Sequence, residues 1–251
     1  MVSVIMLVHN AKKYTVHSIK TLMETEDRDS YELIVVDNDS DKATKKALFQ
    51  LQQKGYIDKL LYLQENTLFA KGNNIGSLLC SKESKYILLL NSDVEIRNKE
   101  WLKLMMKMHP ENGGIVTLGI CPKPYLRGDG YALLIDKDLY LKYQLDENFE
   151  WWWSVTKLQA LLLKDGYTVI AIQNHNNILY HFGGMSGRSW KEAQGLNTEG
   201  EAVKKWFLNN KIKVISDISV DSDKNVEIKK LFHLQNKLEK KGKQIVHKIV
   251  K

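Results

Sequence analysis

The sequence contains few residues of the kinds that crosslink or stiffen a chain. Its 251 residues include only two cysteines, Cys80 and Cys121, and three prolines. Two cysteines cannot form a disulfide framework, and no Cys/His cluster has the spacing of a zinc site. With 43% hydrophobic and 27% charged residues, the composition is that of a globular protein. We therefore expect a single compact body in a reducing compartment, built around a hydrophobic core.

Long apolar runs are also missing. The opening run, residues 1–8, ends at His9-Asn10, well short of the apolar region of a signal peptide. Nowhere do about 18 apolar residues follow one another, as a membrane-spanning helix requires. These absences predict a protein that is neither exported nor membrane-spanning by its own signals. We expect it in the cytoplasm, with peripheral contact to the inner face of the membrane as an alternative.

Arginine is scarce although the chain is basic. The formal net charge is +7 and the pI is about 9.1, yet only four of the 37 basic residues are arginines. Lysines create a diffuse positive field and lack the forked donors with which arginine recognises phosphate. The charge therefore predicts an anionic partner but does not choose among a nucleotide, a nucleic acid, a phospholipid surface and an acidic polymer.

Short β-rich runs alternate with helical patterns through the first part of the chain. We expect strands at 2–8, 32–36, 60–63 and 86–90. Helical patterns cover 14–23, 42–54, 70–80 and 101–109, the third opening after a turn at Gly72. This alternation is typical of βαβ units, so the predicted fold class is α/β, with a mostly parallel sheet flanked by helices.

The character of the sequence changes near residue 112. All three prolines lie between 110 and 124, and aromatic residues become denser. We place a first half at 1–112 and a second, smaller half at 113–222, with a helix beginning near Trp153 and ending before Gly166, and strands at 167–172 and 177–180. Residues 223–251 are rich in lysine and have the apolar spacing of an amphipathic helix.

Polar residues follow three of the expected strands: His9-Asn10, Asp37-Asn38 and 91–93. Ligands of parallel sheets bind at the carboxyl ends of the strands, so these groups should converge on one edge. A carboxylate such as Asp93 could bind a divalent cation that bridges phosphates, although Asn, Ser and Asp also form ordinary turns.

Two further features are ambiguous. His181 precedes Gly183-Gly184, where bare backbone could approach a ligand closely, yet an isolated histidine is more often a packed side chain. The segment Gly72–Gly76 could cradle phosphate at a helix N-terminus, but it lacks the spacing of a Walker or dinucleotide-binding loop.

Taken together and in order, these motifs resemble the family 2 glycosyltransferases of the GT-A fold. The resemblance covers about residues 2–185. The motifs that carry it are, along the chain, VSVI at 2–5 with His9-Asn10, IVVDNDS at 34–40, NTLFAKGNNIG at 66–76, LLLNSDV at 88–94 with Trp101-Leu102, DENF at 146–149, Gly166-Tyr167 and HFGG at 181–184.

The resemblance implies that the donor is a sugar nucleotide, with UDP or dTDP as its nucleotide. Asp93 and His181 would share one Mn²⁺ or Mg²⁺ ion, with Asn91 in place of the first Asp of the family's D-x-D motif. His9 and Asn10 would flank the base, while Asp37 and Asn38 would contact base and ribose. The full set implied to bind nucleotide is Val8, His9, Asn10, Asp37, Asn38, Lys71, Asn91 and Ser92.

One departure from the family concerns the catalytic base. In the family, a Glu-Asp pair and a further Asp follow the D-E-x-F motif, and the Asp of the pair deprotonates the acceptor. Counted from Phe149, those places hold Ser154, Val155 and Lys157. Four explanations are open: Glu150 or another carboxylate serves as the base, the acceptor is already nucleophilic, the reaction retains configuration, or the protein binds donor without turnover. A positioned base contributes ~10²- to 10⁴-fold.

The acceptor is expected beside Trp151, Trp152 and Trp153, because aromatic faces stack on sugars and on nucleobases. Adjacent side chains cannot all point one way, so at least one tryptophan should close the core. Most members of the family act on a saccharide or lipid-linked acceptor, so the resemblance implies such an acceptor. An alternative acceptor is a modified base in DNA, in which case the basic segment 223–251 would bind DNA. With a lipid-linked acceptor, the same segment would bind an anionic membrane surface. Lys157 would face either an anionic acceptor or solvent.

Overall fold

The computed structural model describes residues 1–25, 28–185 and 193–216. The described residues belong to one compact unit. The expected basic helix at 223–251 lies outside the described residues, and its binding to DNA or membrane stays a prediction. The expected division of the rest into 1–112 and 113–222 also stays a prediction, although strands from both parts enter one sheet.

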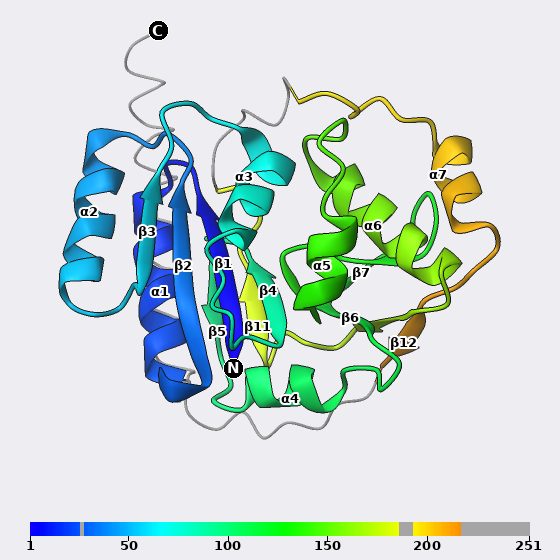
Figure 1. The fold of residues 1–251 in the computed structure, drawn as a ribbon, viewed down its shortest axis with the longest axis horizontal. Coiled ribbons are helices and arrows are strands. Elements are labelled where there is room, and N and C mark those ends of the chain that lie inside the picture. The colour runs from blue at the N-terminus through cyan, green and yellow to red at the C-terminus, as the bar shows by residue number, and fades with distance from the viewer. Residues whose placement is uncertain (26–27, 186–192, 217–251) are drawn as a thin grey trace, which may run out of the picture. The chain divides into compact units, whose positions relative to one another are not determined.

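An eight-stranded sheet forms the centre of the unit (Figure 1). Every pair of neighbours is parallel except where β9 pairs with β4 and with β6, so the prediction of a mostly parallel sheet is confirmed. In spatial order the strands are β12 (Lys213–Ile215), β10 (Thr168–Ile172), β6 (Gly114–Leu118), β9 (Ala132–Asp136), β4 (Tyr86–Leu90), β1 (Val2–Val8), β2 (Tyr31–Asp37) and β3 (Lys59–Tyr62).

Helices connect these strands, and two short strand pairs lie outside the main sheet. The helices are α1 (Lys12–Thr25), η1 (Arg28–Ser30), α2 (Lys42–Gln53), α3 (Leu68–Ser77), α4 (Trp101–Lys107), α5 (Lys137–Tyr143), α6 (Trp152–Lys164) and α7 (Gly200–Phe207). The short pairs are both antiparallel: β5 (Val94–Ile96) with β11 (Leu179–His181), and β7 (Ile120–Cys121) with β8 (Arg127–Gly128).

One face of the sheet packs against α3, α5 and α6. Ile5 of β1 and Leu89 of β4 belong to a buried cluster with Ala70, Tyr140 and Leu158, one residue from each helix. Figure 1 shows α3 in front of β1, with α5 and α6 further along the sheet. Since strands covered on both faces are apolar throughout, their sequences read as continuous hydrophobic runs.

The glycines of the 72–76 segment have a packing role. The structure places Gly72 inside α3, which begins at Leu68, so the expected turn and phosphate cradle at this segment are wrong. A Cβ atom on Gly72 would lie 2.5 Å from Leu7 Cδ1, and one on Gly76 would lie 2.6 Å from Ile5 Cγ2. The missing side chains let α3 approach β1 more closely than any larger residue would allow.

In the described ranges, no helix combines the length and the apolar character that crossing a bilayer requires.

Candidate functional site at the edge of the sheet

The polar residues that follow β1 and β2 are joined to each other. His9 Nδ1 lies 2.7 Å from the Asn38 carbonyl oxygen, and the Asn10 backbone N–H donates to Ser40 Oγ at 2.8 Å. The strand register explains this contact, because Val8 lies opposite Asp37 in the last rung of the β1–β2 pair. The expected convergence of the strand ends is therefore observed.

The backbone around this edge is held in a conformation that L-residues rarely adopt. Asn10, Ala11, Asp39 and Leu68 have φ angles of 57°, 55°, 56° and 60°. Each such residue costs on the order of 1–3 kcal/mol, and such positions cluster at functional sites. Here they mark the loops after β1 and β2 and the start of α3.

Asn38 ties the edge to the segment that leads into α3. Its Oδ1 accepts hydrogen bonds from the Thr67 N–H at 2.8 Å and the Thr67 hydroxyl at 2.9 Å, and its Nδ2 donates to Asn66 Oδ1 at 2.8 Å. A cavity of about 60 Å³ opens beside it, and His9 and Asn91 also line this cavity. The ends of β1, β2 and β4 thus contribute to one small polar cavity.

Of the eight residues expected to bind nucleotide, four are absent from the described lining of this cavity: Val8, Asn10, Asp37 and Lys71. The Asp37 side chain is fully buried and its Oδ1 has no hydrogen-bond partner, and burial raises the pKa of its carboxyl above the usual value. Lys71 is exposed on α3, with Nζ 3.7 Å from Glu65 Oε1. Neither Asp37 nor Lys71 belongs to the described lining of this cavity or of the larger cavity that Trp152 of α6 lines.

The Asn91–Asp93 turn after β4 is held by α1. The Ser18 hydroxyl lies 2.9 Å from the Ser92 carbonyl oxygen and 2.6 Å from that of Val94, and its oxygen accepts the Val94 N–H at 2.9 Å. The β5–β11 pair then sets Val94 directly opposite His181. This pairing brings the end of β11 to the end of β4.

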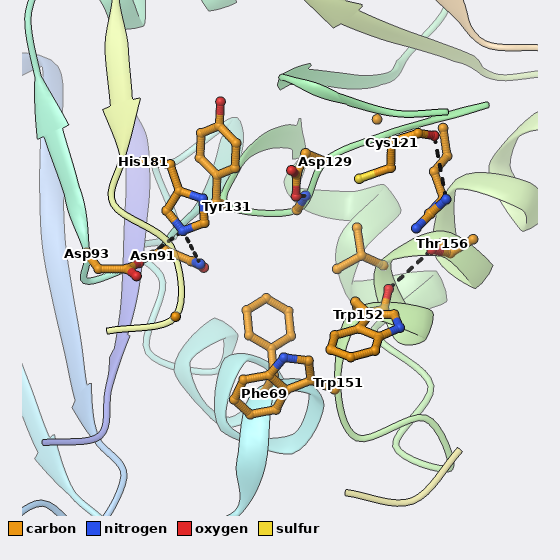
Figure 2. A pocket seen from close by; sticks show the side chains of 15 residues that line it. Phe69, Asn91, Asp93, Cys121, Asp129, Tyr131, Trp151, Trp152, Thr156 and His181 are labelled. Carbon is orange, nitrogen blue, oxygen red and sulfur yellow. Dashed lines mark hydrogen bonds and ion pairs between the residues drawn. The ribbon is translucent and has the colours of Figure 1, made fainter. Parts of the chain in front are cut away.

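Asp93 and His181 consequently meet. His181 Nε2 lies 3.1 Å from Asp93 Oδ1 and 3.3 Å from Asn91 Nδ2, while Asp93 Oδ2 accepts the Met185 N–H at 3.2 Å (Figure 2). The Asp93 side chain is 7% exposed and that of His181 is 25% exposed. One carboxylate and one imidazole are donors that suit Mn²⁺, and they suit it better than Mg²⁺, which prefers oxygen ligands. Across the described residues, no group of three or more His, Cys, Asp and Glu could hold a metal.

The Tyr131 ring packs against the ring of His181. Its ring stacks on the His181 ring, with centroids 4.4 Å apart, and on the His175 ring at 5.6 Å, and its hydroxyl contacts His175 Nε2. Burial, together with the neighbouring His181, lowers the pKa of His175 to about 4, although the charge of Asp129 acts in the opposite direction. His175 is therefore neutral near pH 7.

A larger cavity of about 300 Å³ separates two groups of residues. We call Asn91, Asp93 and His181 the histidine side, and Trp152, Val155 and Thr156 of α6 the tryptophan side. Figure 2 shows the two sides facing each other across the cavity, with Tyr131 and Asp129 along the segment that connects them and Phe69 and Trp151 opposite that segment.

The three tryptophans divide as the sequence analysis expected. Trp153 is 9% exposed in a core cluster with Phe207, and its Nε1–H donates to the Leu196 carbonyl oxygen at 3.1 Å. Trp151 and Trp152 line the cavity, and Trp152 is 39% exposed. Two aromatic faces are therefore available to a ligand.

The residues at the places of the family's acidic set are structural. Ser154 is buried, with its hydroxyl donating to the Trp151 carbonyl oxygen at 2.6 Å, and Val155 lines the cavity. The Lys157 ammonium pairs with the Asp146 carboxylate and lies 4.8 Å from the centre of the Phe149 ring. Lys157 is thus paired within the chain, with its side chain 30% exposed, and it is absent from the described lining of the cavity, so a contact with an anionic acceptor stays a prediction.

Glu150, the weak candidate for the base, is engaged elsewhere. Its Oε2 accepts the Gln194 N–H at 2.6 Å, and Glu150 is absent from the described lining of the cavity. Asp129, which the sequence analysis missed, does line it. The signal in the sequence was a carboxylate between two glycines, Gly128 and Gly130, a pattern that also forms common turns.

The sequence and the fold both resemble those of known proteins. The family model described as Glycosyl transferase family 2 matches residues 3–174. The Pyrobaculum calidifontis mannosyltransferase PcManGT, in complex with GDP-Man and Mn²⁺, superposes with a TM-score of 0.58 at 16% identity, over 69% of this chain and 55% of that one. Staphylococcus aureus TarS 1-349 in complex with UDP gives a TM-score of 0.50 at 16% identity, over 63% and 55%. The chain thus spans about half the length of these proteins, and no curated protein matches the sequence.

Proposed function

The chain belongs to glycosyl transferase family 2, and we propose that it transfers a sugar from a UDP- or dTDP-sugar to a hydroxyl group of a saccharide or lipid-linked acceptor. Its fold is the GT-A fold, a mixed α/β sheet flanked by helices. The observation that carries the proposal is the contact of Asp93 with His181 at the edge of the sheet, across a cavity from exposed aromatic rings.

A divalent cation fits the histidine side. Asp93 and His181 would hold Mn²⁺ or Mg²⁺, with Asn91 beside them, and diphosphate oxygens and water would complete its ligands. When bound, the cation would neutralise the negative charge that develops on the departing diphosphate. The presence of Mn²⁺ and GDP-Man in the mannosyltransferase complex supports this assignment.

The small cavity, at about 60 Å³, would receive part of the nucleoside. His9, Asn38, Asn91 and Ser92 line it, so their polar groups can fix the orientation of the base and ribose. Val8, Asn10 and Asp37 would act through the backbone that carries these side chains. A direct contact of Lys71 with diphosphate stays a prediction, because its ammonium points to Glu65.

The tryptophan side would receive the acceptor. Trp152 is partly exposed at the start of α6, and Trp151 lies beside Phe69 with ring centres 6.2 Å apart. Such faces stack well on the apolar face of a sugar ring. The acceptor hydroxyl would then approach the donor across the cavity from the side opposite Asp93.

A second candidate is a protein that binds sugar nucleotide without turning it over. The observation that favours it is Val155, an apolar side chain in the cavity at the place where the family has its catalytic Asp. Against it stands the Asp93–His181 contact, since a protein that only binds donor has less need of a metal site.

Turnover separates these candidates. Release of nucleoside diphosphate from a panel of UDP- and dTDP-sugars should occur with Mn²⁺ and stop with a chelator. Asp93→Asn should lower the release at least ~10³-fold, whereas Asp138→Asn, the same change at an exposed position on α5, should match the wild type. If no donor is turned over while UDP still binds, the protein is a binder.

A further inference from the structure

Deprotonation of an acceptor hydroxyl requires a base, and the cavity offers few groups that could act. Of the described residues that line the cavity, two are carboxylates, Asp93 and Asp129. Asp93 is engaged with His181 and the Met185 N–H. The Cys121 thiol also lines the cavity, but burial and the charge of Asp129 raise its pKa to about 11, so it stays protonated. Asp129 is the carboxylate that remains.

We propose that Asp129 is the catalytic base that accepts the proton of the acceptor hydroxyl, an assignment that rests on the proposed glycosyl transfer. It lies in the connection between β8 and β9, on the wall that joins the histidine side to the tryptophan side (Figure 2). A base must reach the hydroxyl while that oxygen attacks the donor, and this wall is where both substrates would be within reach.

The backbone of Asp129 is fixed on several sides. Its N–H donates to the Gly119 carbonyl oxygen at 3.0 Å, and its carbonyl oxygen accepts the Thr117 hydroxyl. The preceding Gly128 exchanges two hydrogen bonds with the Gln159 side chain, at 2.8 and 3.0 Å. A group held this firmly can be aimed at one position, as general-base catalysis requires.

Flanking glycines bring this segment close to the place where the family's base is missing. A Cβ atom on Gly130 would lie 3.0 Å from Val155 Cγ2, and one on Gly128 would lie 2.1 Å from Thr117 Cγ2. The backbone next to Asp129 therefore packs directly against Val155. A carboxylate carried by the β8–β9 connection occupies the region that α6 leaves apolar.

The carboxylate of Asp129 is available to a substrate. Its Oδ1 accepts the Gly130 N–H at 2.7 Å, the carboxylate also forms a hydrogen bond with the Cys121 thiol, and it forms no ion pair with any residue in the described ranges. The nearby Arg127 guanidinium instead binds carbonyl oxygens, among them those of Lys123 and Tyr125, and lies 5.0 Å from the centre of the Trp153 ring. Asp129 can therefore take a proton without first breaking an ion pair.

The step balances without another reactant. An electron pair of the acceptor oxygen forms the bond to the anomeric carbon, while the bond from that carbon to the diphosphate oxygen breaks and its electron pair leaves with the diphosphate. The O–H bond of the acceptor breaks, and its proton passes to the Asp129 carboxylate and later to water.

Asp129→Asn tests this role, because it preserves the shape and an oxygen that can accept the Gly130 N–H. Calorimetry should show UDP binding in the presence of Mn²⁺ within about threefold of the wild type. Release of nucleoside diphosphate, with water as the acceptor, should fall by ~10²- to 10⁴-fold. The exposed control Asp138→Asn should show neither change.

Azide distinguishes a base from a structural residue, since the azide anion attacks without losing a proton. Azide should restore nucleoside diphosphate release in Asp129→Asn and give a glycosyl azide by mass spectrometry, but it should not restore Asp93→Asn. Wild-type rates in Asp129→Asn, or a loss that azide does not relieve, would overturn the assignment, as would a comparable loss confined to Glu150→Gln. If the wild type itself turns over no donor, the proposed function fails, and this assignment with it.

Discussion

The two sides of the cavity are built in different ways. The histidine side follows the end of a central strand, β4, and the adjoining small cavity is lined by residues from the ends of the neighbouring strands β1 and β2. The tryptophan side belongs to a helix, and Asp129 to a short connection between β8 and β9. A strand end is fixed by the register of its neighbours, whereas a helix and a connection can exchange residues without disturbing the sheet. We infer that the first side determines the donor and that the second is free to determine the acceptor.

The sharpest test of this division is on the tryptophan side. Trp152→Ala should raise KM for the acceptor roughly 10-fold, because a stacked aromatic ring contributes about 1–2 kcal/mol, and it should leave KM for the donor unchanged. Phe49→Ala is the matched control, since Phe49 is an exposed aromatic residue on α2 outside the cavity. Steady-state kinetics with each substrate varied in turn provides the measurement. A rise in the donor KM would contradict the division.

A smaller effect is expected behind the histidine side. Because the pKa of His175 falls from 6.5 to about 4 on folding, the unfolded chain binds more protons between these values, and stability is lost as the pH falls through this window. In His175→Gln, the decrease in the free energy of unfolding between pH 7 and pH 5 should be smaller by roughly 1–2 kcal/mol. This is less than the full pKa difference implies, because the ring is partly exposed. Urea unfolding at pH 7 and pH 5 measures it. Equal pH dependence in both proteins would show that His175 is not buried in its neutral form.

The smallest effect concerns Lys157, which was expected from the sequence to face either an anionic acceptor or solvent. Lys157→Met should lower the free energy of unfolding by about 0.5–1 kcal/mol, since it removes the contacts with Asp146 and the Phe149 ring, both partly exposed. Lys164→Met, at an exposed position in the last turn of the same helix, should have no such effect. Thermal or urea unfolding provides the measurement, and the acceptor KM should not change. An altered acceptor KM would place Lys157 in the site after all.

The histidine side and the adjoining small cavity were the easier parts to predict from the sequence. Apolar runs that end in His9-Asn10, Asp37-Asn38 and Asn91 mark parallel strands and their carboxyl ends, and physical rules alone bring these ends together. The contact of Asp93 with His181 was expected only from the family resemblance. In the structure it depends on the antiparallel β5–β11 pair, whose strands of three residues are too short to have a recognisable pattern.

Three other features could not be predicted because they depend on tertiary contacts. A turn was expected at Gly72, but this glycine lies inside α3, where the lack of a side chain lets the helix pack against Leu7. Lys157 looked solvent-exposed or ligand-binding, but it pairs with Asp146, eleven residues earlier in the chain. Asp129 was not singled out from the sequence, and its place in the cavity follows from β9, which reverses direction within an otherwise parallel sheet. None of these contacts has a local signature.

The most direct test of the account is the uptake of UDP with and without Mn²⁺, measured by calorimetry on the wild type and on His181→Ala. The account predicts that Mn²⁺ strengthens UDP binding to the wild type at least ~10-fold and that His181→Ala removes this gain while retaining the weaker, metal-independent binding. Equal affinity of the wild type with and without Mn²⁺, or an undiminished gain in His181→Ala, would contradict a metal–diphosphate site between Asp93 and His181.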